Sequence, residues 1–301
     1  MTPRLRNLAL AATTASVGLV PALDARADEN YFGYSYGGET LPRGHFELYN
    51  WLTWRHDKGG GDYDALDLKQ EVEYGITDRF QTALELNESY HAIHDSAPFE
   101  EDPETGARES EFSNRHELAF QGVEAEFKYA FLSPYKDPLG LALFVAPGYN
   151  RVDKVSGEHE TEWELETKLI LQKNFLDDQL IAVFNASPEF ELGKGRGDHD
   201  TESELALEFA GGLIYRFLPK WYAGVEARYH SEYPNFDDEW TREHWATFVG
   251  PVVHYASERW WATLTVLPQV YGKPQEEEQS RQLHLDEHER VEVRFKTGFN
   301  F

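Results

Sequence analysis

Two sets of side chains in this sequence could do chemistry, the histidines and the regularly spaced carboxylates. HLDEH at 284–288 places His284 and His288 four residues apart, the spacing of a two-histidine metal site on a helix. On a strand the same pair would lie about 13 Å apart, too far for one ion to bind both. Five other histidines could serve an acid–base or hydrolytic site, namely His91, His94, His116, His230 and His244. None has a partner at motif-like spacing, so we predict no catalytic residues, no cofactor and no metal site.

The carboxylates recur at every second position in several segments. In LDLKQEVEY, residues 66–74, apolar residues alternate with Asp67, Lys69, Glu71 and Glu73. The same alternation returns at 123–129, 162–169, 202–209 and 291–301. A period of two places the two sets on opposite faces of a strand. These segments therefore predict strands with one polar and one apolar face.

These side chains lie on strands, and the connections between the strands alternate strictly between short and long. We expect twelve strands, at about 43–56, 65–76, 80–93, 116–131, 140–152, 161–175, 179–192, 202–217, 221–232, 242–256, 259–271 and 284–301. Most are long enough for the ~9–11 residues that a strand needs to cross a membrane. An even number of strands, with short turns at one end and long loops at the other, indicates an all-β fold. The fold we expect is an antiparallel up-and-down transmembrane β-barrel. A hairpin hidden in 94–115 would add two strands, and ten strands is the other alternative.

Aromatic residues support a membrane protein over a soluble sandwich. They gather beside the short turns, as Phe80, Tyr129, Phe217, Trp221 and Trp260 do. Such a ring places amphipathic side chains at the level of the lipid headgroups. A soluble sandwich would instead concentrate its aromatics in the middle of the strands.

The first residues and the overall charge narrow the class further. Residues 1–27 have the charged start, apolar middle and Ala25-Arg26-Ala27 end of a cleaved signal peptide. Removing them leaves 274 residues with 25 Lys or Arg and 53 Asp or Glu, a formal charge of −28. This charge excludes nucleic acid as a partner, and the chain has no cysteine for a disulfide. Residues 28–42 could hang in the periplasm, plug the barrel or add a strand, and 43–301 would form the barrel.

The final strand carries a resemblance to a known class of protein. VEVRFKTGFNF, residues 291–301, resembles the assembly signal of Gram-negative outer-membrane β-barrels. The matching residues are Val291, Val293, Phe295, Phe299 and Phe301, and Thr297 departs from the pattern. Residues 31–55 resemble the start of uncharacterised proteobacterial barrels grouped with aromatic-degradation-type outer-membrane transporters. The resemblance implies the outer membrane, both termini in the periplasm, and the barrel-assembly machinery and lipopolysaccharide as partners.

If the apolar faces contact lipid, the charged faces line the interior. The residues we expect there are Glu71, Glu73, Glu124, Glu126, Glu164, Glu166, Glu204, Glu208, Arg228, Arg294 and Lys296. Carboxylates outnumber cations among them, and acidic linings attract cations in channels. We therefore predict a narrow outer-membrane channel for passive diffusion of small solutes, with cations preferred. A plugged barrel with a structural or surface role, and a lipid-modifying enzyme, are the alternatives.

Overall fold

The computed structural model describes residues 30–97, 113–195, 201–236, 240–274 and 282–301. The expected signal peptide and most of the loop at 94–115 lie outside these residues. The described chain forms twelve strands: β1 (Phe46–His56), β2 (Gly60–Thr77), β3 (Phe80–Ala97), β4 (Arg115–Leu132), β5 (Gly140–Val152), β6 (His159–Phe175), β7 (Leu180–Gly195), β8 (Glu202–Leu218), β9 (Trp221–Pro234), β10 (His244–Ala256), β11 (Trp260–Pro274) and β12 (Val291–Asn300). Among the described residues no helix is long and apolar enough to cross a membrane.

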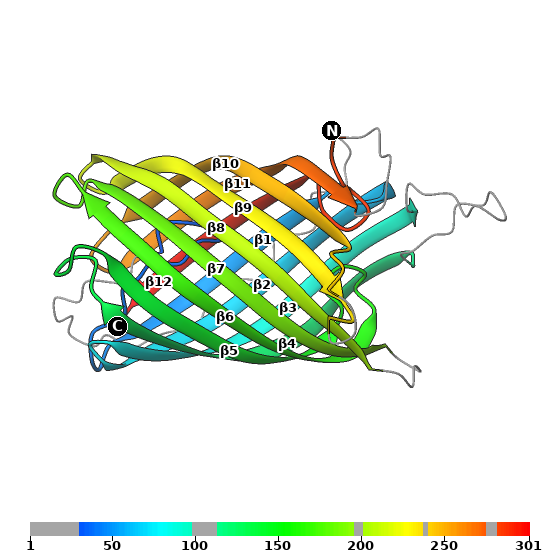
Figure 1. Ribbon diagram of the computed structural model, residues 1–301, viewed down its shortest axis with the longest axis horizontal. Coiled ribbons are helices and arrows are strands. Elements are labelled where there is room, and N and C mark those ends of the chain that lie inside the picture. Colours follow the sequence, from blue (N-terminus) through cyan, green and yellow to red (C-terminus); the bar gives the residue numbers. More distant parts are fainter. Residues whose placement is uncertain (1–29, 98–112, 196–200, 237–239, 275–281) are drawn as a thin grey trace.

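The strands form one closed antiparallel barrel, so the predicted fold class is confirmed. Each strand pairs with its neighbours in sequence, and β1 closes against β12 with Leu48 opposite Phe299 and Trp54 opposite Val293. Figure 1 shows the strands steeply tilted, with the short turns and the C-terminus gathered at one end. Closure removes the free sheet edges, whose unpaired backbone groups could not be satisfied in lipid.

The two faces of each strand differ as the alternation predicts. On β3, Leu84 and Leu86 are exposed on the outside, while Glu85 and Asn87 are buried inside. Exposed aromatics lie near the short turns, including Tyr129, Phe131, Phe217, Trp221 and Trp260. The barrel therefore has an apolar outer surface with an aromatic girdle and a polar interior, the reverse of a soluble sandwich.

The last strand is shorter than the sequence predicts, and this expectation was wrong. β12 begins at Val291, whereas residues 284–290 form an irregular segment with buried side chains. Gln269 holds this segment, because its amide nitrogen donates to the carbonyl of His284 (2.8 Å) and its oxygen accepts from the His284 backbone nitrogen (2.7 Å). Contacts to a neighbouring strand thus hold these residues outside the sheet, and the alternation of the last strand begins only at Val291. β2 also begins earlier than expected, because residues 60–63 pair with β3 alone.

Residues 30–42, which we call the N-terminal plug, lie inside the barrel. The Glu226 carboxylate accepts hydrogen bonds from the backbone nitrogens of Gly33, Tyr34 and Ser35 (3.0, 2.8 and 2.6 Å). Gln172 accepts from the nitrogen of Gly38, and Gln81 from that of Leu41, both at 2.7 Å. On β8, a side chain at Gly212 would overlap the ring of Phe32. Hydrogen bonds and the space left by Gly212 therefore fix the position of the plug against the barrel wall. The plug fills the half of the barrel near the short turns.

Candidate functional site

The remaining space in the barrel is a cavity of about 570 Å³ above the plug. Tyr34 and Tyr36 of the plug form its floor. Its upper boundary is formed by loop residues 153–156 and 287–289, which lean in over the opening. Fifteen carboxylates and seven Lys or Arg side chains line it, so acidic side chains outnumber basic ones about two to one.

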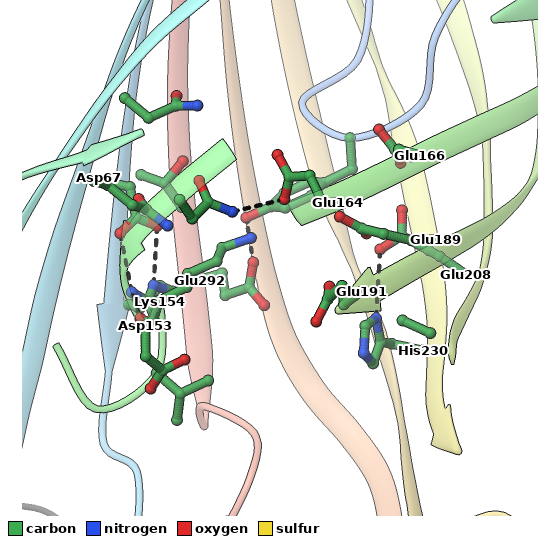
Figure 2. Close-up of a pocket in the computed structure, with 18 of the residues that line it drawn as sticks. Asp67, Asp153, Lys154, Glu164, Glu166, Glu189, Glu191, Glu208, His230 and Glu292 are labelled. Carbon is green, nitrogen blue, oxygen red and sulfur yellow. Dashed lines mark hydrogen bonds and ion pairs between the residues drawn. The ribbon is translucent and has the colours of Figure 1, made fainter. Parts of the chain in front are cut away.

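Most of the unbalanced charge belongs to three adjacent strands, β6, β7 and β8. We call the seven carboxylates that they present to the cavity the acidic wall: Glu162, Glu164, Glu166, Glu189, Glu191, Glu204 and Glu208. Glu164 lies directly opposite Glu191, which lies opposite Glu204, and Glu166 lies opposite Glu189. Figure 2 shows several of these carboxylates projecting into the same space. Like charges in directly opposed positions destabilise a sheet, so packing alone does not explain this arrangement.

Cations neutralise only part of the acidic wall. Within the described chain, ion pairs to Lys or Arg reach Glu166, from Lys168, and Glu208, from Arg228. Glu162 and Glu164 instead accept hydrogen bonds from the amide of Asn150 (2.9 and 2.8 Å). A neutral amide adds no positive charge, so the wall contains more carboxylates than cations.

Two arginines stack on the plug at the floor of the cavity. Arg294 on β12 lies over the Tyr34 ring at 3.8 Å and Arg228 on β9 lies over it at 4.8 Å. Glu292 joins them, accepting from Arg228 and from the Tyr34 hydroxyl, both at 2.5 Å. Arg228 is therefore held between Glu292 and Glu208 of the acidic wall, and both arginines stack on the Tyr34 ring.

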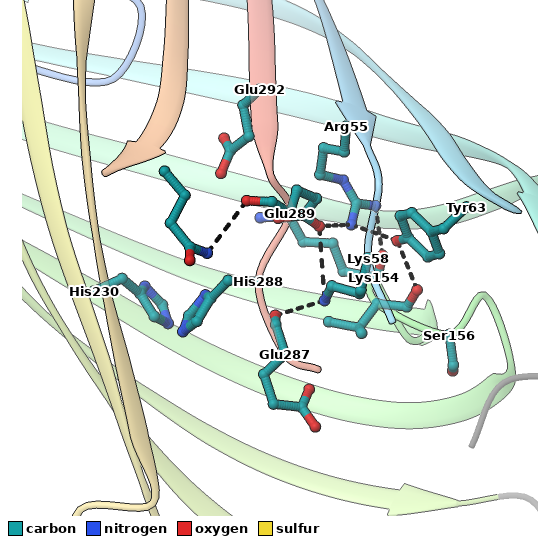
Figure 3. Close-up of polar contacts among 12 residues, drawn as sticks. Arg55, Lys58, Tyr63, Lys154, Ser156, His230, Glu287, His288, Glu289 and Glu292 are labelled. Carbon is teal, nitrogen blue, oxygen red and sulfur yellow. Dashed lines mark hydrogen bonds and ion pairs between the residues drawn. The ribbon is translucent and has the colours of Figure 1, made fainter. Parts of the chain in front are cut away.

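Arg55 of β1 ties two loops over the cavity (Figure 3). Its guanidinium makes two 2.9 Å bonds to Asp67 and another to Glu289, and it donates to the carbonyl of Lys154 at 2.5 Å. Glu289 belongs to the loop before β12 and Lys154 to the loop between β5 and β6. Burial alone would raise the pKa of the Glu289 carboxyl, but the nearby cations Lys58 and Arg55 lower this pKa to about 2.

The histidines of 284–288 lie closer together than a strand would place them, which corrects our expectation. Their ring centroids are 5.7 Å apart, because residues 284–288 do not form a strand. His230 and His244 of β9 and β10 complete a cluster of four, in which His244 Nδ1 lies 3.1 Å from His288 Nε2 and Glu232 binds both strand histidines. Burial, with His244 and Lys58, lowers the pKa of His284 to about 4, and burial with His244 and His230 lowers that of His288. The other three candidate histidines lie elsewhere: His91 is buried against the Lys154 carbonyl, and His94 and His116 are exposed at the outer ends of β3 and β4.

The residues that we expected to line a pore divide into two groups. Those lining the cavity are Glu124, Glu164, Glu166, Glu204, Glu208, Arg228 and Arg294. Those buried away from it, beside the plug, are Glu71, Glu73, Glu126 and Lys296. In the expected assembly signal, Phe295, Phe299 and Phe301 are exposed on the outside, and Val291 and Val293 are half-buried.

Sequence reasoning missed several cavity residues. Glu189 and Glu191 alternate with Pro188 and Phe190 in PEFEL, so the same parity rule could have found them. Arg55, Asp67 and Glu292 carry the same signal on their own strands. Glu287 and Glu289 could not have been found this way, because they reach the cavity from a loop.

Comparison with known proteins agrees with the fold. A family model described as a family of unknown function (DUF6662) matches residues 24–301. The COG4313 outer membrane channel from Pseudomonas putida F1 is similar with a TM-score of 0.53 and 12% identity, over 87% of this chain and 97% of that one. The NanC porin gives a TM-score of 0.46 and 12% identity, over 84% and 98%. No curated protein matches. At 12% identity, the similarity to the COG4313 channel shows a shared fold, that of an outer-membrane β-barrel.

Proposed function

We propose that this chain, which belongs to the DUF6662 family of unknown function, is an outer-membrane channel through which small solutes diffuse passively, with cations preferred. The proposal rests on the acidic wall, where opposed carboxylates face a cavity of about 570 Å³ and outnumber the cations paired with them. Acidic rings favour cations in channels by the same electrostatics. The fold adds support, because its apolar exterior suits a barrel embedded in lipid.

Passage requires a route past the plug. The hydrogen bonds of Glu226, Gln172 and Gln81 hold the plug to the wall on several sides. Conduction therefore takes place along the wall beside the plug or after part of the plug has moved. The same hydrogen bonds favour a second candidate function, a closed barrel with a structural or surface role.

Planar-bilayer recording of the refolded mature protein separates the two candidates. We would compare the wild type with a variant lacking residues 30–42. The channel proposal expects discrete conductance steps in the wild type and larger steps in the deletion variant. Steps from the deletion variant alone would favour the closed barrel, and silence from both inserted proteins would reject the channel.

A further inference from the structure

A second acidic group lies in the wall of β2, β3 and β4, outside the cavity. It consists of Glu71, Glu85 and Glu126, which are only 2%, 0% and 4% exposed. Glu71 lies directly opposite Glu85, and Glu126 lies opposite Ala83 on the same face. One ligand oxygen from each residue lies within 4.8 Å of those of the other two. Three buried carboxylates thus converge on one point.

The hydrogen bonds at this point leave carboxylate oxygens unsatisfied. Lys69 donates to one oxygen of Glu85 at 2.7 Å. The other oxygen of Glu85 and one oxygen of Glu126 are buried and have no hydrogen-bond partner. The amide oxygen of Asn87, two residues along β3 on the same face, is also buried without a partner. Buried acceptors of this kind are strongly unfavourable unless a cation or a donor satisfies them.

We propose that Glu71, Glu85 and Glu126 bind one divalent cation of the hard, oxygen-preferring class, with Ca²⁺ as the best fit. Ca²⁺ binds oxygens at about 2.3–2.6 Å, so two oxygens on one ion lie at most about 5 Å apart, and these three meet that limit. Ca²⁺ also tolerates irregular geometry, whereas Mg²⁺ requires a near-ideal octahedron. Water would supply the remaining ligands. The ion satisfies the orphan oxygens and offsets the repulsion between the carboxylates.

The site lies where the wall meets the plug. The three carboxylates are close enough to Tyr36 of the plug to act electrostatically on its hydroxyl. Lys296, which neighbours the same ring at 5.5 Å, donates to the plug carbonyl of Phe32 at 3.5 Å. An ion here therefore joins three strands beside the plug and stabilises the closed arrangement. This role does not depend on conduction through the barrel.

The test is calorimetric titration of CaCl₂ into the refolded, chelator-stripped mature protein in detergent micelles at pH 7.5. We expect one saturable site per chain and a rise in melting temperature on saturation. Glu126→Gln and Glu71→Gln should each weaken Ca²⁺ binding at least ten-fold. Glu258→Gln, an exposed acid in the turn between β10 and β11, is the matched control and should bind as the wild type does.

Each result of the Ca²⁺ titration either supports or overturns the proposed site. If the variants do not fold, titration of the wild type alone decides the proposal. A wild type without a saturable Ca²⁺ site overturns it and indicates that the three carboxylates share protons instead. Binding that survives both Gln substitutions also overturns it, since the ion then sits elsewhere, for example at the acidic wall. Glu71→Asp, which keeps the charge and should fold, is expected to bind more weakly than the wild type and more tightly than Glu71→Gln. A bilayer recording without conductance would leave this result unchanged, so failure of the two proposals is distinguishable.

Discussion

Glu164 on β6 lies directly opposite Glu191 on β7, and both carboxylates face the cavity above the plug. Glu204 continues the row on β8. A sheet gains stability from opposed pairs of unlike charge and loses it from pairs of like charge. The row is therefore a local cost to the fold, which fits residues retained for contact with a solute.

Replacing the opposed pair should stabilise the barrel. Glu164→Gln combined with Glu191→Gln removes the repulsion and keeps the size of both side chains, so we expect a gain of ~0.5–1 kcal/mol in the free energy of unfolding. Urea unfolding of the protein in lipid vesicles measures it, with Glu258→Gln as the control. A loss of stability would mean that the pair serves the fold, through a shared proton or an ion.

Glu226 should hold the plug in place. Its carboxylate accepts three backbone hydrogen bonds from Gly33, Tyr34 and Ser35. Hydrogen bonds to a charged group contribute ~1.5–3 kcal/mol each, so Glu226→Ala should speed amide exchange at residues 33–35 by about a hundred-fold or more. Strand amides far from the plug provide the internal control. Unchanged exchange at the plug would show that its aromatic packing suffices to hold it.

Arg55 should control the loops over the cavity. Arg55→Met keeps the length of the side chain but leaves Asp67 and Glu289 buried without their guanidinium, and breaking a buried pair in this way costs ~3–5 kcal/mol. We expect the loops at 153–158 and 282–290 to become accessible to protease. Arg290→Met, which removes an exposed ion pair to Asp57, is the matched control. Equal resistance of both variants would contradict the role given to Arg55.

The loop before β12 should loosen in acid. The pKa of His284 is lowered from 6.5 to about 4, so the folded loop disfavours the protonated ring. The packing of this loop is therefore at full strength above pH 6.5 and weakens as the pH falls toward 4. The Glu289 carboxylate does not add to this change, because its pKa of about 2 keeps it ionised throughout. Hydrogen exchange at 282–290, measured between pH 7.5 and 4.5, should accelerate in the wild type and change less in His284→Asn. Equal acceleration in both proteins would assign the effect to other groups.

The sequence alone was sufficient for the barrel, because period two and the alternation of turn lengths are local signals. It failed at 284–290, which were joined to the last strand although Leu285 is the one apolar residue among them and the alternation begins only at Val291. The buried contacts of Gln269 and His244 set that segment, and they join residues far apart in the chain. The plug was also undecided, since Phe32, Tyr34 and Tyr36 alternate as they would in a strand and the partners of this segment lie on distant strands. Glu85 follows the parity rule in ALELNES, but its closeness to Glu71 and Glu126 depends on strand register, which the sequence does not display.

The reversal potential under a KCl gradient measures whether the acidic wall selects cations. Wild-type protein and the variant carrying Glu164→Gln and Glu191→Gln would be compared in planar bilayers. We expect a cation-selective potential for the wild type and a shift toward zero in the variant, because the acidic wall supplies the selectivity. A wild-type potential at zero or of anion-selective sign, or one that the substitutions leave unchanged, would contradict it.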